Sequence, residues 1–166
     1  MSLSRLGLSS RRAFLLSLSA LPLAACNFQP VYGPGGSGEI IRNQIRVADP
    51  ASRLEFELVA RLEDRLGTGS NYMLDYVIDR TTRNLAIDED AVINRINLVG
   101  TLTFTVREAG TGRTVQTGEV STFTSYATTE SPVATESARR DAEDRLAIAL
   151  ADQVVTRLIA GAASWS

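Results

Sequence analysis

Residues 95–107 read Arg-Ile-Asn-Leu-Val-Gly-Thr-Leu-Thr-Phe-Thr-Val-Arg and alternate between apolar and polar side chains along almost their whole length. Successive side chains of a β-strand point to opposite faces of the sheet. The apolar parity holds Ile96, Leu98, Gly100, Leu102, Phe104 and Val106, whereas the other parity is polar except at Val99. This stretch therefore predicts a strand with one buried face and one polar face.

The segment after this strand predicts a hairpin. Residues 109–112, Ala-Gly-Thr-Gly, have the composition of a turn, and Thr114 to Tyr126 form a second strand-like segment. Val115 and Val120 would lie on opposite faces of a regular strand, so we expect Gly118 to mark a β-bulge.

The segments before it predict two further strands. Residues 72–78 alternate in the same way and predict a strand, while residues 81–90 are polar and predict a loop. Residues 40–47 form a short apolar run that is typical of a first strand.

Two helices complete the pattern. Asp49-Pro50 is a helix-start signal, leucines recur every four residues from Leu54 to Leu66, and Gly67 is a natural end, which predicts a helix over 50–66. A second helix is predicted over 135–160. Its expected ion pairs, four residues apart, are Arg139–Glu143, Arg140–Asp144 and Asp141–Arg145.

The order strand, helix, three strands, helix favours the α+β class. We predict a two-layer sandwich with a four-stranded, mainly antiparallel sheet and both helices packed on one face. The opposite sheet face, rich in threonine and arginine, is expected to stay uncovered.

The N-terminal segment has the features of a lipoprotein signal peptide. Arg5, Arg11 and Arg12 precede an almost uncharged apolar run over 13–25, which is too short to span a bilayer. The run ends in Leu-Ala-Ala-Cys, residues 23–26, so we expect cleavage between Ala25 and Cys26 and lipidation of Cys26. The twin arginines leave export by the Sec or the twin-arginine route open.

The residues after Cys26 indicate a tether and the membrane to which the lipoprotein is sorted. Asn27 stands where an aspartate commonly retains lipoproteins in the inner membrane, so we expect the outer membrane. Proline and glycine over 26–38 predict a lipidated tether, followed by the folded domain over 39–166.

Composition excludes several functions. After Cys26 the chain carries 14 arginines against 19 acidic side chains, hence a net charge of −5, which argues against nucleic-acid binding. One cysteine and no histidine exclude an internal disulfide, a Cys/His metal site and a histidine-based catalytic triad. The acidic run Asp88-Glu89-Asp90 lacks the ligand spacing of a calcium loop. We therefore expect no metal, no cofactor and no enzymatic activity.

The uncovered sheet face is the best candidate for a contact surface. Arginines on a threonine-rich sheet can hold phosphate or carboxylate groups. The alternative is an ordinary solvated strand face. Arg80 and Arg83 leave the preceding strand. The proposed contacts with a partner protein or an anionic lipid head group are Arg95, Thr103, Thr105, Arg107 and Arg113.

Residues 26–33, Cys-Asn-Phe-Gln-Pro-Val-Tyr-Gly, resemble the start of mature LptE-type proteins of lipopolysaccharide assembly, in their alphaproteobacterial branch. Asn27 departs from the usual glycine. Residues 140–147 and 151–158 of the last helix, and Tyr126 before it, are also similar to the family.

This resemblance implies the same two-helix, four-stranded fold and a non-catalytic role. The protein would be anchored by its lipid on the periplasmic side of the outer membrane. It would plug and help assemble an LptD-type β-barrel and so aid delivery of lipopolysaccharide to the cell surface.

Two other functions stay open at this stage. One is an auxiliary lipoprotein of an envelope lipid or solvent transport system with a similar small domain. The other is a lipid-anchored hydrolase that uses the carboxylates of Asp88-Glu89-Asp90.

Overall fold

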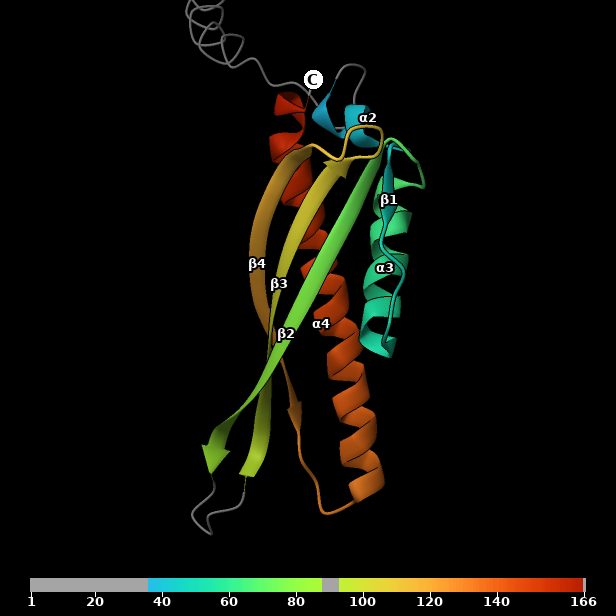
Figure 1. Cartoon of the computed structure of the whole chain (residues 1–166). Helices are drawn as coiled ribbons and strands as arrows, with labels where there is room; N and C mark the ends of the chain where they lie inside the picture. The colour runs from blue at the N-terminus through green and yellow to red at the C-terminus, as the bar shows by residue number, and fades with distance from the viewer. Residues whose placement is uncertain (1–35, 88–92, 166) are drawn as a thin grey trace, which may run out of the picture. The chain divides into compact units, whose positions relative to one another are not determined.

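The computed structural model describes residues 36–87 and 93–165, all within the compact unit Val31–Ser166 (Figure 1). Its elements are α2 (Ser37–Ile41), β1 (Ile45–Val47), α3 (Arg53–Leu66), β2 (Tyr72–Ile87), β3 (Ile93–Glu108), β4 (Thr114–Ala127), α4 (Pro132–Gly161) and a short 3-10 helix (Ala162–Ser164).

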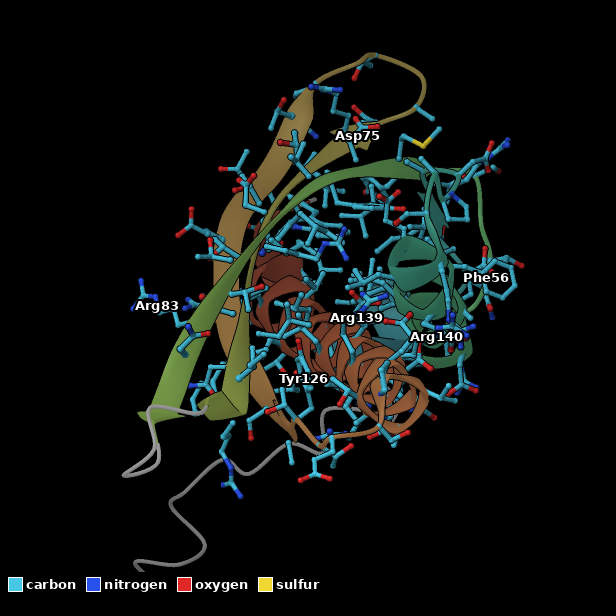
Figure 2. All side chains as sticks on the ribbon, turned by 90° about the horizontal axis from the view of Figure 1, so that it is seen from below. Phe56, Asp75, Arg83, Tyr126, Arg139 and Arg140 are labelled. Carbon is cyan, nitrogen blue, oxygen red and sulfur yellow. The ribbon has the colours of Figure 1, made fainter. Side chains whose placement is uncertain are left out.

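The strands form one sheet in the order β1-β2-β3-β4. β1 pairs with β2 in parallel, while β2 with β3 and β3 with β4 pair antiparallel. α3 and α4 lie side by side on one face of the sheet (Figures 1 and 2). The predicted α+β sandwich with a mainly antiparallel sheet is therefore confirmed.

The core lies between this sheet face and the two helices. Leu102, Phe104 and Val106 of β3 are buried, as are Leu146 and Leu150 of α4. Gly100 lets α4 approach the sheet closely, since a Cβ there would lie 3.0 Å from Leu146 Cδ2. The alternation that predicts β3 is therefore the alternation between core and solvent.

The predicted first strand over 40–47 is wrong in its first half. Residues Ser37–Ile41 form α2, and only Ile45–Val47 pair with β2. Asn43, between them, has a φ of 58°, a left-handed conformation that interrupts an extended chain. Ile41 is buried with the core all the same, which accounts for the apolar run in the sequence.

The predicted start of the first long helix is also wrong. α3 begins three residues later, with Ser52 as its N-cap. Ser52 Oγ accepts from the Glu55 N–H at 3.3 Å, and Glu55 Oε2 accepts from the Ala51 N–H at 2.8 Å. This reciprocal capping supplies an acceptor to the Glu55 N–H of the first turn and to the Ala51 N–H just before the cap, which a proline at position 50 does not do. The predicted end at Gly67, whose φ is 71°, is confirmed.

The predicted loop over 81–90 is strand for most of its length. β2 continues to Ile87 because Thr81, Thr82 and Arg83 pair with Val99, Leu98 and Asn97 of β3. A polar strand is stable here because β3 supplies the ladder of backbone hydrogen bonds. The remaining three residues, Asp88-Glu89-Asp90, lie outside the described residues.

The bulge in β4 is not at Gly118. The register shifts between Gln116 and Thr114, so the extra residue is Val115. Gly118 pairs directly with Phe104, and a Cβ there would lie 2.7 Å from Phe104 Cζ. Gly118 is therefore needed for space rather than for a bulge.

α4 begins and ends beyond its predicted limits of 135 and 160. Ser131 caps its start, where Pro132 takes the first position. The pairs Arg139–Glu143 and Asp141–Arg145 form, but Arg140 pairs with Glu136 and Asp144 pairs with Arg53 of α3. The predicted pair Arg140–Asp144 is therefore wrong, because Asp144 faces the neighbouring helix.

The helical segment Pro132–Ser164 is long and apolar enough to cross a membrane by length and composition. Its apolar residues, among them Leu146, Leu150 and Leu158, are buried against the sheet and α3. The segment is therefore the central helix of this core.

Candidate functional site

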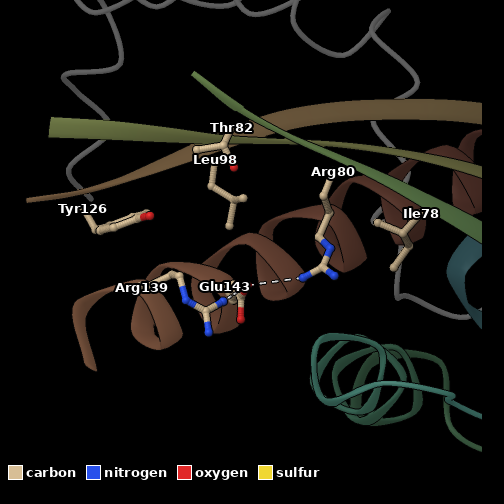
Figure 3. A pocket seen from close by; sticks show the side chains of 7 residues that line it. All are labelled: Ile78, Arg80, Thr82, Leu98, Tyr126, Arg139 and Glu143. Carbon is tan, nitrogen blue, oxygen red and sulfur yellow. Dashed lines mark hydrogen bonds and ion pairs between the residues drawn. The ribbon is translucent and has the colours of Figure 1, made fainter. Parts of the chain in front are cut away.

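A crevice opens between the sheet and the N-terminal half of α4 (Figure 3). Its volume is about 480 Å³. Its lining residues are Ile78, Arg80 and Thr82 of β2, Leu98 of β3, Tyr126 of β4, and Arg139 and Glu143 of α4. Aliphatic side chains and guanidinium groups thus share one cavity.

Glu143 joins the two walls of the crevice. Its Oε1 lies 3.2 Å from Arg80 Nη1 and 2.6 Å from Arg139 Nη1. Only 14% of the Glu143 side chain is exposed. One carboxylate thus contacts two guanidinium groups in a partly desolvated place.

Glu136 supplies the next link of this network. Arg139 contacts both oxygens of Glu136, at 2.9 Å through Nε and 2.7 Å through Nη2. Arg140 Nε adds a third contact at 2.9 Å. The hydrogen bonds from Arg139 and then Arg140 lower the pKa of Glu136 to about 2. The bond to Glu136 likewise raises the pKa of Arg139 above its ordinary value.

These shifts fix the charge of two members of the network. Glu136 and Arg139 stay charged across the physiological pH range, so neither can exchange a proton as a general acid or base. A cavity with aliphatic walls and fixed guanidinium groups suits an anionic amphiphile, since guanidinium holds phosphate or carboxylate.

The uncovered sheet face carries the residues predicted from sequence. Thr103, Thr105 and Arg107 project together from β3, and Arg107 Nη1 lies 2.6 Å from Asp75 Oδ2 of β2. Arg113 lies by the turn, 3.5 Å from Glu108. Arg95 shares the face, but it lies about 40 Å from Arg107 along a strand with a rise of about 3.3 Å per residue. The structure thus groups three of the five residues and separates Arg95 from them.

Arg80 lies on the helix-covered side of the sheet, which corrects its predicted place beside the uncovered face. Arg80 shares the parity of Tyr76 and Ile78 and points towards α4, whereas Arg83 points away from the helices (Figure 2). The crevice is absent from the sequence-based prediction for this reason. The alternation of β2 indicates that Arg80 points towards the helices. The loop predicted from residue 81 ends the strand too early, so the wall formed by residues 80–82 was not expected.

Other predicted features fall outside this site. Ala25, Cys26 and Asp88-Glu89-Asp90 lie outside the described residues. Within residues 36–87 and 93–165 no group of three or more Asp, Glu, Cys or His side chains is placed to hold a metal ion.

The structure defines a small two-layer α+β domain with a crevice between its layers. The sequence model of the LptE family, described as lipopolysaccharide assembly, matches residues 42–158. That range runs from before β1 to near the end of α4. The chain therefore belongs to the LptE family.

Solved structures of lipoproteins share the fold. A candidate lipoprotein from Caulobacter crescentus superposes with a TM-score of 0.64 at 21% identity, covering 78% of this chain and 97% of that one. Rare lipoprotein B from Shewanella oneidensis gives 0.54 at 14% identity, covering 70% and 92%. Lipoprotein B from Nitrosomonas europaea gives 0.55 at 12% identity, covering 82% and 95%. A comparison with curated protein sequences found no match.

Proposed function

We propose that this protein is an outer-membrane lipoprotein, anchored through Cys26 on the periplasmic side. In this proposal it plugs and helps assemble an LptD-type β-barrel and aids delivery of lipopolysaccharide to the cell surface. Membership of the LptE family over residues 42–158 carries the proposal. The role is assembly and binding rather than catalysis.

The surface of the domain supports a place inside a barrel. Large outer-membrane barrels have polar interiors. The outward side chains of β3 and β4 are mainly threonine, serine and charged groups, and Thr101 Oγ1 lies 3.1 Å from Ser121 Oγ between them. Among the described residues, no charged or polar residue is buried, so the polar side chains lie at the surface.

Two surfaces are proposed for lipopolysaccharide or the barrel. The crevice combines the guanidinium groups of Arg80 and Arg139 with an aliphatic wall. The uncovered face offers Arg107 with Thr103 and Thr105, flanked by Arg113 and, at a distance, Arg95. Phosphate groups on an amphiphile match Arg80 in the crevice and Arg107 on the uncovered face.

Depletion in the native host tests the function. We expect depletion to lower both the amount of assembled barrel and the surface lipopolysaccharide, measured by heat-modifiability of the barrel and by surface labelling. Wild-type protein supplied in trans should restore both. Normal barrel and normal surface lipopolysaccharide after depletion would refute the proposal.

A lipid-anchor variant and a purification complete the design. Cys26→Ala should abolish labelling by a radioactive fatty acid, and labelling that persists would refute the anchor. Purification of the wild-type protein in detergent should yield a barrel of several hundred residues. Recovery of inner-membrane transporter components instead would favour an auxiliary lipoprotein of lipid or solvent transport.

A further inference from the structure

β4 is an edge strand whose outer backbone groups can be identified. The Glu108 N–H donates to the Arg113 carbonyl at 2.9 Å, so the backbone of Glu108 faces β4. Alternate residues of an antiparallel strand face the same neighbour. Gly100, Leu102, Phe104 and Val106 therefore face β4 as well, and their partners there are Thr122, Val120, Gly118 and Gln116.

The intervening residues of β4 direct their N–H and C=O groups away from the sheet. Arg145 Nη2 donates to the Ser125 carbonyl at 3.2 Å, which agrees with this assignment. In the described part of the chain no other hydrogen bond reaches this row. Its remaining members are Thr117, Glu119, Ser121 and Phe123.

A groove runs beside this open row. It has a volume of about 310 Å³ and lies between β4 and the last turns of α4. Gln116, Thr117, Gly118 and Glu119 form one side, and Arg157, Ala160 and Gly161 form the other, over the ring of Phe104. Gln116 fixes its width, because its Nε2 donates to the Arg157 carbonyl at 2.9 Å.

The groove carries two opposite charges without ion pairs. Neither Glu119 nor Arg157 has a salt-bridge partner within residues 36–87 and 93–165, although eleven other pairs are formed there. Phe123, two residues beyond Ser121 on the same face, is 64% exposed. An added strand with a basic residue near Glu119 and an acid near Arg157 would match these charges.

Natural sheets usually protect a long edge with proline, charged side chains, a bulge or a covering element. From Thr117 to Phe123 the edge has no proline and a single charged residue, Glu119, and its bulge lies earlier, at Val115. At the opposite edge β1 pairs with residues 72–74 of β2. The outward row of β2 beyond Leu74 is open as well, but the charges beside it, Arg80, Arg139 and Glu143, pair with one another. Among the described edges, β4 combines an open row with a groove whose charges lack salt-bridge partners.

We propose that β4 takes up an extended segment of a partner protein as a fifth strand, in register with residues 117–123. Main-chain hydrogen bonds would supply affinity, and the groove with Glu119 and Arg157 would supply specificity. The partner's identity as the envelope barrel rests on the proposed function, but the mode of binding follows from β4 itself.

Site-specific photo-crosslinking of the full lipoprotein in its native envelope tests this proposal. A photoreactive amino acid replaces Thr117, Glu119 or Ser121 in turn, or Thr103 in the middle of the sheet as a control. Mass spectrometry maps the adducts. We expect one partner segment whose crosslinked residue moves by about two positions at each step, because paired strands share a two-residue repeat. Scattered adducts, no adduct, or adducts between two copies of this chain would overturn the proposal.

Backbone and charge variants make the test specific. With the probe at Ser121, Thr117→Pro removes one outward N–H and should lower adduct yield by about tenfold, the effect of one lost hydrogen bond. Asn84→Pro, which removes an N–H on the opposite edge, is the matched control and should keep the yield. Arg157→Glu leaves the backbone intact and should also lower it. Thermal unfolding checks that each variant folds, and unchanged yield in both Thr117→Pro and Arg157→Glu would overturn the proposal.

Failure of this inference is distinguishable from failure of the proposed function. A barrel that co-purifies without the stepwise adducts refutes strand addition alone. Stepwise adducts on a protein other than a barrel confirm strand addition and refute the barrel as the partner.

Discussion

At the scale of single residues, spaces as well as side chains determine this fold. Gly118 lies opposite Phe104, whose ring is 1% exposed and occupies the place of the missing Cβ. The sequence shows that a glycine lies within this strand, but it does not show why. The side chain that leaves no room for a Cβ there belongs to Phe104, which is fourteen residues away on the paired strand. The bulge predicted there was therefore placed three residues too late.

The space at Gly118 leads to a stability prediction. Gly118→Ala should lower the free energy of unfolding by about 1–3 kcal/mol, the usual cost of overpacking, because its Cβ would lie 2.7 Å from Phe104 Cζ. Urea unfolding measures it. In a Phe104→Leu background the same change should cost less, since the ring edge is gone. Equal costs in both backgrounds would contradict the steric explanation.

At the scale of elements, α4 depends on an arginine–glutamate network at its N-terminal end. Spacing alone predicted Arg139–Glu143 and Asp141–Arg145 because partners four residues apart lie on one helix face. It failed at Arg140–Asp144, since Asp144 contacts Arg53 of α3 at 3.1 Å. Contacts between helices depend on packing angles that no single helix sequence contains.

The network at Glu136 predicts that the stability of the fold decreases at low pH. Its pKa is lowered from 4.5 to about 2 in the folded protein, so the stabilisation that it provides is present above about pH 4.5 and is lost as the pH falls through 2. Thermal unfolding midpoints across this range should fall less steeply in Glu136→Gln than in the wild type. Glu130→Gln is the control, because Glu130 lies just before the helix and has no salt bridge among the described residues. Identical slopes for Glu136→Gln and wild type would exclude this network as the cause.

At the scale of the whole domain, the core is uneven along the sheet. The largest buried side chains come mainly from α3, from Leu102 to Val106 of β3 and from Leu146 onward in α4. The other end of β2 and β3 borders the crevice. The class, the antiparallel order and the covered face were predictable, because alternation in residues 95–107 and the leucine stripe in α3 are local signals. The crevice was not predictable, since it depends on how far α4 lies from residues 78–82.

This unevenness predicts a gradient of local stability. Amide hydrogen exchange at Thr81 and Arg83, whose backbones face β3, should require a lower opening free energy than exchange at Leu102 and Phe104, because fewer buried contacts hold that end of the hairpin. Exchange measured by NMR on the lipoprotein in detergent gives residue-level values. Equal protection at both ends would show that the crevice does not weaken the sheet.

The packing of Trp165 has a spectroscopic consequence. The chain has one tryptophan, and it is 2% exposed, with its ring centroid 5.0 Å from that of Tyr72 and its Nε1 donating to Gln116 Oε1 at 2.9 Å. Its fluorescence therefore reports on one place, the junction of β2, β4 and the end of α4. Events at the groove beside Gln116 can thus be followed by an intrinsic emission signal, with no added dye or label.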